Sequence, residues 1–271
     1  DGVYQILVKQ TNAAGEVQTA SALNVTVDSV SSVAQQSLVD NDASTITIVY
    51  SETLDAGFEP LASDFSVTRN SETFNVQSVT VNGQSVILDI EGDLSEGALQ
   101  IAYTPSSSLM QDIAGNQIES GFTQLVVSDG YIRDVKIYAD ANNNGIADEN
   151  ELIQGVTTDS LGQVILSDDL TSSPIIISGG VNVDSGAINQ LELTAPSGYL
   201  VVNPLSTLVQ EIFASNDAQS VNEAEVILSD ALGITLAEGE DLSGYDPISD
   251  TSENAIANRV AVTQIATVLA V

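Results

Sequence analysis

The chain has 271 residues, enough for two or three domains of ordinary size, and 43% of them are hydrophobic and available to fill cores. Its 38 acidic and 5 basic residues give a formal charge of −33, which repels nucleic-acid phosphates and anionic lipids. The sequence has no Cys and no His, so it excludes disulfides, thiolate sites and imidazole chemistry.

The strongly acidic composition has two interpretations. Self-repulsion at this charge must be screened, and dissolved salt or bound divalent cations would do so, as in salty, calcium-rich water. Plain acidic solubility explains the same composition. No apolar run approaches the length of about 18 residues that a membrane-spanning helix needs, so we expect no membrane span. Because the surface is so acidic, we expect no nucleic-acid partner.

The first 28 residues predict two strands, 3–8 and 22–27, separated by a turn-rich stretch at 12–15. Two strands alone are marginal in water. We therefore expect residues 1–28 to be the C-terminal strands of an incomplete Ig-like repeat. Those strands would pair with residues outside this chain, with a neighbouring molecule or with the domain that follows.

Residues 29–128 predict a complete Ig-like antiparallel β-sandwich. Strands are expected at 45–50 and 65–68, and Asn82-Gly83 between two apolar runs is a strong hairpin signal. Leu99, Ile101 and Tyr103 alternate with other residues, and a last strand is expected near 122–127. Short strands at this spacing are typical of a β-sandwich.

Two further regions complete the expected order. Residues 129–200 predict a small β domain with strands at 135–138, 164–166 and 175–177. Residues 201–271 predict a truncated helical segment, with helices after Pro204, near 221–232 and after Ser252. Their apolar stripes indicate ordinary core packing. The stripes consist of Leu205, Leu208, Val209 and Ile212, then Val221, Val226, Ile227, Leu228 and Leu232, then Ile256, Val260, Ile265, Val268 and Leu269.

One motif is sharp. Residues 140–151 match the calcium-loop pattern D-x-[DN]-x-[DN]-G-x5-E at every specified position. Ca2+ takes six to eight hard oxygens, and this spacing can supply them, with Gly145 allowing the tight turn at the sixth position. The expected ligands are side-chain oxygens of Asp140, Asn142, Asn144, Asp148 and Glu151 and the main-chain carbonyl of Ile146.

The flanks of this loop differ from those of a helix–loop–helix sensor, because a strand at 135–138 leads into it. We therefore expect a structural Ca2+ site; the alternative is a polar, Asn-rich turn without a metal. Further calcium sites are conceivable near Asp28, Asp112, Asp129 and Asp159. Each of these carboxylates has an alternative role in a turn or as a solvated group.

Several segments resemble repeats of large bacterial surface proteins. Residues 1–28, from Asp1-Gly2-Val3-Tyr4 to Val25-Thr26-Val27-Asp28, resemble the closing strands of bacterial Ig-like repeats. Residues 39–127 are similar to another repeat of giant surface proteins through Tyr50-Ser51-Glu52-Thr53-Leu54, Asp64-Phe65-Ser66-Val67 and Asp112-Ile113-Ala114-Gly115-Asn116.

The C-terminal half carries two more resemblances. The loop 140–151, with Thr158-Asp159-Ser160-Leu161-Gly162, resembles the calcium-bearing prealbumin-like B repeats of bacterial adhesins. Ser178-Gly179-Gly180, Leu193-Thr194-Ala195-Pro196 and residues 202–208 are similar to a block of RTX-type and cadherin-like adhesins. Together these segments cover nearly the whole chain.

The resemblances imply a calcium-stabilised structural or adhesive module of a secreted bacterial cell-surface protein. Expected partners are other modules of the same protein, with cell-surface glycans or self-association as further candidates. The alternative is a subunit of a surface layer or filament assembled by strand complementation. We do not expect an enzyme, because the sequence offers no His base, no Trp platform for sugars and no nucleophile motif.

Overall fold

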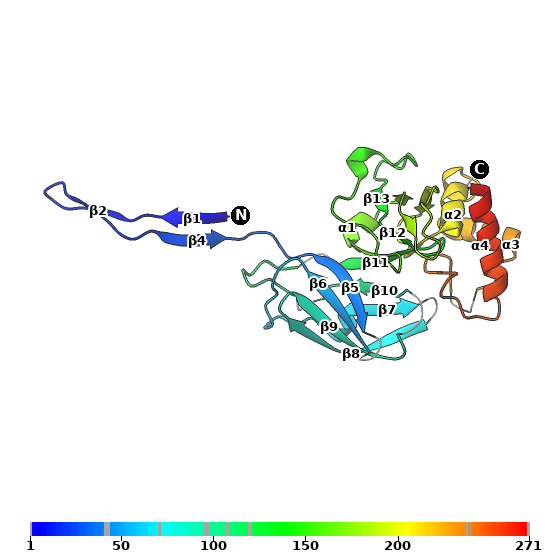
Figure 1. Ribbon diagram of the computed structural model, residues 1–271, viewed down its shortest axis with the longest axis horizontal. Coiled ribbons are helices and arrows are strands. Elements are labelled where there is room, and N and C mark those ends of the chain that lie inside the picture. The colour runs from blue at the N-terminus through cyan, green and yellow to red at the C-terminus, as the bar shows by residue number, and fades with distance from the viewer. Residues whose placement is uncertain are drawn as a thin grey trace.

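The computed structural model describes residues 2–40, 44–69, 72–94, 98–106, 109–118, 121–236, 238 and 240–269, without the side chains of residues 169, 267 and 268. The fold is mainly β, as predicted, with helices concentrated near the C-terminus. A long two-stranded ribbon projects from a compact body, in which a curled sheet lies beside a smaller β and helical region (Figure 1).

The described elements follow one another as strands with helices late in the chain. The strands are β1 (Gly2–Ile6), β2 (Lys9–Thr11), β3 (Val17–Thr19), β4 (Leu23–Val27), β5 (Ala34–Asp40), β6 (Thr45–Tyr50), β7 (Phe65–Arg69), β8 (Glu72–Asn82), β9 (Ser85–Glu91), β10 (Gln100–Tyr103), β11 (Phe122–Val127), β12 (Ile132–Arg133), β13 (Lys136–Ala139), β14 (Gln163–Ser167), β15 (Ile175–Ser178), β16 (Val181–Asn182), β17 (Leu193–Ala195) and β18 (Val201–Val202). The helices are α1 (Asp168–Thr171), α2 (Pro204–Ala214), α3 (Val221–Leu232) and α4 (Ala255–Leu269), with 3-10 turns η1 (Ala62–Asp64) and η2 (Glu149–Glu151).

The N-terminal ribbon consists of β1 paired antiparallel with β4, continued by β2 paired with β3. Both predicted strands are present. Within the described residues they pair only with each other, and both faces of the ribbon are exposed. Its large exposed hydrophobic residues are Val3, Tyr4, Ile6, Leu7, Val8, Val17, Leu23 and Val27.

The central sheet has nine strands in the order β14-β11-β10-β7-β8-β9-β6-β5, with β18 added in parallel to β11. It curls until its two edge strands, β5 and β14, lie beside each other without a described ladder between them. The predicted alternation is visible in β6, where Ile46, Ile48 and Tyr50 face the interior.

The predicted hairpin joins β8 to β9. Asn82 pairs with Ser85, so the two residues of the loop are Gly83 and Gln84 and not Asn82 and Gly83. Gly83 has φ 63°, a conformation that favours glycine in a tight hairpin turn.

Strands β11 and β14 contribute side chains to two hydrophobic cores, one on each face of the sheet. Phe122 and Ile165 face the core inside the curled sheet, whereas Leu125 and Leu166 face a second core on the other side. Burial on both faces explains why β14 carries a continuous apolar run and not a strict alternation.

The second core is covered by the sheet β13-β15-β17 and by the C-terminal helices. Helix α2 begins at a capping box in which the Asn203 side chain accepts a hydrogen bond from the Ser206 N–H, and Pro204 occupies the first turn. Helix α3 is capped at its start by Ser220, whose side chain accepts the Glu223 N–H, and at its end by Gly233, which has φ 68°. The predicted helix starts and the Gly233 stop are therefore confirmed.

The apolar stripes are only partly in the core. Leu205, Val209 and Leu228 are buried, but Val226 is exposed. In α4, Ile256 is 79% exposed and Val260 is also exposed, because the helix turns Val262 and Ile265 inward. The expectation that all these side chains pack in a core is wrong at Val226, Ile227, Ile256 and Val260. The side chain of Val268 lies outside the described residues.

The predicted division at residues 28, 128 and 200, and the tandem Ig-like arrangement, stay predictions. The pairing of β14 and β18 with β11 joins residues on both sides of positions 128 and 200 into one sheet. Among the described residues, no helix is long and apolar enough to cross a membrane.

Candidate metal sites

The loop 140–151 lies between β13 and the 3-10 turn η2. A strand leads into it, as predicted, and an isolated bridge between Tyr138 and Leu152 closes its base. Gly145 has φ 69°, as a tight turn at the sixth position requires. Any ion held here would therefore link the end of a core strand to the segment that follows the loop.

Asp140 is the most deeply buried residue of this loop, with 1% of its surface exposed. Its Oδ1 accepts the Asn144 N–H at 3.0 Å and its Oδ2 accepts the Gly145 N–H at 2.9 Å. A carboxylate oxygen has more than one acceptor site, so these bonds orient Asp140 and leave lone pairs for a cation.

The two Asn residues and Asp148 are already in contact. Asp148 Oδ2 accepts the side-chain amides of Asn142 at 3.2 Å and Asn144 at 3.0 Å. The amide oxygens of Asn142 and Asn144 accept the N–H groups of Asn144 and Ile146 at 2.9 Å and 2.8 Å. Ile146 offers a carbonyl that accepts the Asp148 N–H at 2.9 Å, with its second lone pair left over.

Glu151 closes the loop. Its Oε1 accepts the Asn142 N–H at 3.2 Å, which holds the end of the loop near its start. Its Oε2 is shielded from solvent and has no hydrogen-bond partner among the described residues. A buried carboxylate oxygen without a donor costs free energy, and a cation is the partner that the twelfth position of such a loop normally receives. The donor set therefore fits Ca2+.

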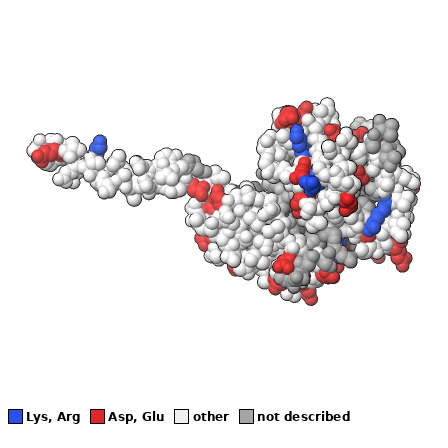
Figure 2. All heavy atoms as spheres, in the orientation of Figure 1, with Lys and Arg blue, Asp and Glu red and all other residues white. Residues whose placement is uncertain are grey.

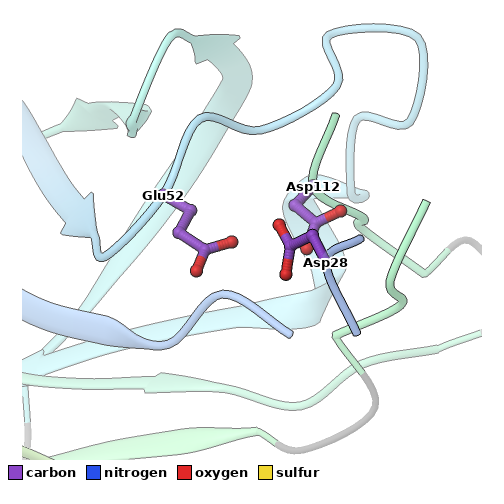
Figure 3. A group of neighbouring side chains, drawn as sticks. All are labelled: Asp28, Glu52 and Asp112. Carbon is purple, nitrogen blue, oxygen red and sulfur yellow. The ribbon is translucent and has the colours of Figure 1, made fainter. Parts of the chain in front are cut away.

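A second group of carboxylates comes from three separate segments. Asp28 follows β4, Glu52 follows β6, and Asp112 is bridged to Leu54. One carboxylate oxygen from each of the three residues lies within 4.8 Å of the corresponding oxygens of the other two. Figure 3 shows Glu52 pointing toward the Asp28 and Asp112 side chains. Asp28 is the first residue after the ribbon, so this group lies where the ribbon joins the body.

The electrostatics of this group differ among its members. Burial and the negative charges of Asp28 and Asp112 raise the pKa of Glu52. Burial would also raise the pKa of Asp112, but hydrogen bonds from Asn116, Ala114 and Gly115 outweigh burial and lower it. None of the three forms an ion pair within the described part of the chain. A divalent cation or a shared proton would relieve their repulsion.

The sequence pointed to Asp28 and Asp112 singly, but not to Glu52. The two other conceivable sites are less organised for a metal. Asp159 accepts the Leu161 and Gln163 N–H groups at 2.8 Å and 2.9 Å, which makes it a turn residue at the start of β14. Burial raises the pKa of Asp129, and among the described residues it belongs to no group of three or more acidic side chains that could hold a metal.

No protein-family model matches the chain, and no curated protein is significantly similar to it.

Proposed function

We propose that the chain is a calcium-stabilised structural and adhesive module of a large, secreted bacterial cell-surface protein, with no catalytic role. The observation that carries the calcium part is the loop 140–151. There, Asp140 is buried and Glu151 keeps a solvent-shielded oxygen without a donor among the described residues. The extracellular location and the adhesive role rest on the sequence resemblances and on the acidic composition.

The role of Ca2+ in this proposal is mechanical. Ligands at about 2.3–2.6 Å from one ion would draw Asp140 and Glu151 together and fix the path from β13 to Leu152. Because β13 belongs to the sheet over the second core, the ion would stabilise the body as well as the loop. Other modules of the same protein, cell-surface glycans and further copies are the proposed partners.

The test is calorimetric titration of Ca2+ into the metal-free chain. We expect binding that Asp140→Ala abolishes and Glu151→Gln weakens. Asp159→Asn is the matched control, because Asp159 also accepts two main-chain N–H groups in a turn but lies outside the loop. If the Asp140→Ala chain binds Ca2+ as the unmodified chain does, the loop is not the site and the proposal fails.

The second candidate is a subunit of a surface layer or filament. The observation in its favour is the ribbon, whose exposed apolar side chains and free strand edges could pair with another copy. Residues 2–27 carry only Lys9 and Glu16 as charged side chains, and most of the ribbon surface is uncharged in Figure 2. Electron microscopy of the chain with and without residues 1–27 separates the two roles, because only the assembly role needs the ribbon for fibres or layers.

A further inference from the structure

The seam between the edge strands β5 and β14 contains an open groove. Its volume is about 740 Å³, and its walls are residues 33–38, 154–160 and 163–165 together with Gln124. Within the described residues, β5 pairs only with β6, and β14 pairs only with β11. Each strand therefore turns one edge of main-chain N–H and C=O groups toward the seam without a ladder partner. A free edge of this kind is what an added strand pairs with.

The β5 side of the groove has little protection against such pairing. Val33 is 58% exposed and Leu38 is 53% exposed, so apolar surface lies along the free edge. Native edge strands are usually guarded by charges, prolines or bulges. In β5 these devices are confined to the two ends, where a bulge lies at the start and Asp40 is the last residue.

Charge favours the ribbon as the segment that fills the groove. Lys9 and Glu16 are the only charged side chains of residues 2–27, whereas the chain as a whole carries −33. Asp159 is the one charged side chain among the described residues that line the groove. Neither Lys9 nor Asp159 forms an ion pair within the described part of the chain. The nearly neutral ribbon can therefore approach the groove, and Lys9 can meet an opposite charge there.

The ribbon is long enough to reach a second molecule. Its proximal strand β1 spans roughly 16 Å, at about 3.3 Å per residue. That is about twice the distance of roughly 8 Å over which salt screens charges at physiological ionic strength. Figure 1 shows the ribbon projecting away from the body. Its distal half, residues 7–19, can therefore touch another copy while the two acidic bodies remain screened from each other.

We propose that the distal half of the ribbon docks in the groove of a second copy, where β2 adds to the free edge of β5. The exposed side chains of Leu7 and Val8 cover those of Val33 and Leu38, and Lys9 lies near Asp159. This inference rests on the assembly role proposed above for the ribbon, and it names the acceptor that such a role requires. Because ribbon and groove are different surfaces, the contact is heterologous and propagates into rings or filaments.

Cross-linking tests the position of the contact. The chain has no Cys, so two introduced thiols are the only ones present. Gln10→Cys in one copy and Ser160→Cys in another, mixed with a short bismaleimide, should give a cross-linked heterodimer. The control for the second thiol is Asn222→Cys, which is exposed on α3 and does not line the groove. It should give no heterodimer above the background of random collisions.

Sedimentation velocity over a range of concentrations tests the strength of the contact. Leu38→Asp should abolish association, because it places a negative charge on the free edge. Val226→Asp is the matched control, since Val226 is 59% exposed but lies on α3, and it should associate as the unmodified chain does. Lys9→Gln should weaken association about two- to fivefold, the value of one exposed ion pair.

The outcomes separate this inference from the assembly role itself. If the unmodified chain associates but Leu38→Asp associates equally well, or if Ser160→Cys cross-links no more than Asn222→Cys, the groove is not the acceptor and the assembly role stands. A chain that stays monomeric at every concentration overturns both. A cross-link inside a single chain carrying Gln10→Cys and Ser160→Cys at high dilution would place the ribbon in its own groove and overturn docking to a second copy.

Discussion

Strands β4 and β6 have the same local pattern and opposite surroundings. Leu23, Val25 and Val27 take every second position in β4, as Ile46, Ile48 and Tyr50 do in β6. Yet Leu23 is 62% exposed, whereas Ile48 is fully buried under the curled sheet. Alternation therefore predicts the strand in both places, but only the curl of the larger sheet brings other side chains onto the apolar face.

The ribbon and the body should consequently be stabilised by different interactions. The body has two cores, and its strands β11 and β14 are buried on both faces. The ribbon has main-chain hydrogen bonds between two strands and little else, which is marginal in water. Four predictions test this contrast.

The largest difference should come from truncating matched side chains. Ile48→Ala should lower the free energy of unfolding by about 2–5 kcal/mol, because it opens a cavity in the core. Leu23→Ala should change it by no more than about 0.5 kcal/mol, because Leu23 is already hydrated. Urea unfolding measures both. Equal losses would mean that the ribbon is packed in solution against something that covers Leu23.

Calcium should raise the stability of the body and leave that of the ribbon unchanged. At a Ca2+ concentration of about one hundred times the Kd, the free energy of unfolding should rise by about 2.7 kcal/mol. Asp140→Ala should remove this gain, and Asp159→Asn should keep it. Thermal melting with Ca2+ and with a chelator is the measurement, and identical curves for the unmodified chain would contradict the prediction.

A smaller effect should come from Glu225, which is buried in the body and accepts a hydrogen bond from Tyr199. Burial raises the pKa of Glu225, and the negative charge of Asp241 adds to this. Because the pKa of Glu225 is higher in the folded chain than in the unfolded chain, protonation of Glu225 stabilises the folded state. This contribution is fully present at acidic pH and is lost as pH rises through the pKa of Glu225 in the folded chain.

Glu225→Gln keeps an oxygen for Tyr199 and removes the charge. It should therefore stabilise the chain at neutral pH, and its advantage should disappear in acid. The control is Glu238→Gln, because Glu238 is exposed, whereas Glu223 accepts a hydrogen bond from the Gln219 N–H. A Glu225→Gln melting temperature that follows the unmodified chain at every pH would contradict the prediction.

The smallest effect should follow from deleting residues 1–27, which leaves Asp28 in place. The body should unfold at the same denaturant concentration to within about 0.5 kcal/mol, because the deleted residues bury almost no side chain. A large loss of stability would show that the ribbon packs on the body.

Local sequence signals found much of the fold. They predicted β6, the β8–β9 hairpin and the helix after Pro204, because alternation, a glycine turn and a first-turn proline are each encoded within a few residues. Strand β5 was not predicted, because its sequence Ala-Gln-Gln-Ser-Leu-Val-Asp has too few apolar residues to alternate. The addition of β14 and β18 to β11 depends on pairing between distant segments, which no local pattern contains.

The two candidate metal sites also differ in how far the sequence could predict them. The loop 140–151 was identifiable because its oxygens come from one continuous segment at fixed spacing. The group of Asp28, Glu52 and Asp112 is assembled from three segments. Glu52 joins it only because the fold brings the segment after β6 next to Asp28, the first residue after the ribbon.

The position of β18 at the edge of β11 also constrains the order in which the chain can fold. Val127 pairs with Val202, and the whole of β12 to β17 lies between them in sequence. Closing so long a loop is entropically costly, so contacts of this kind form late and slow folding. A chain delivered from its N-terminus can pair β5 to β10 early, while β11 keeps an open edge until β14 and β18 arrive. During that interval the exposed edge of β11 is where the nascent chain is most open to aggregation.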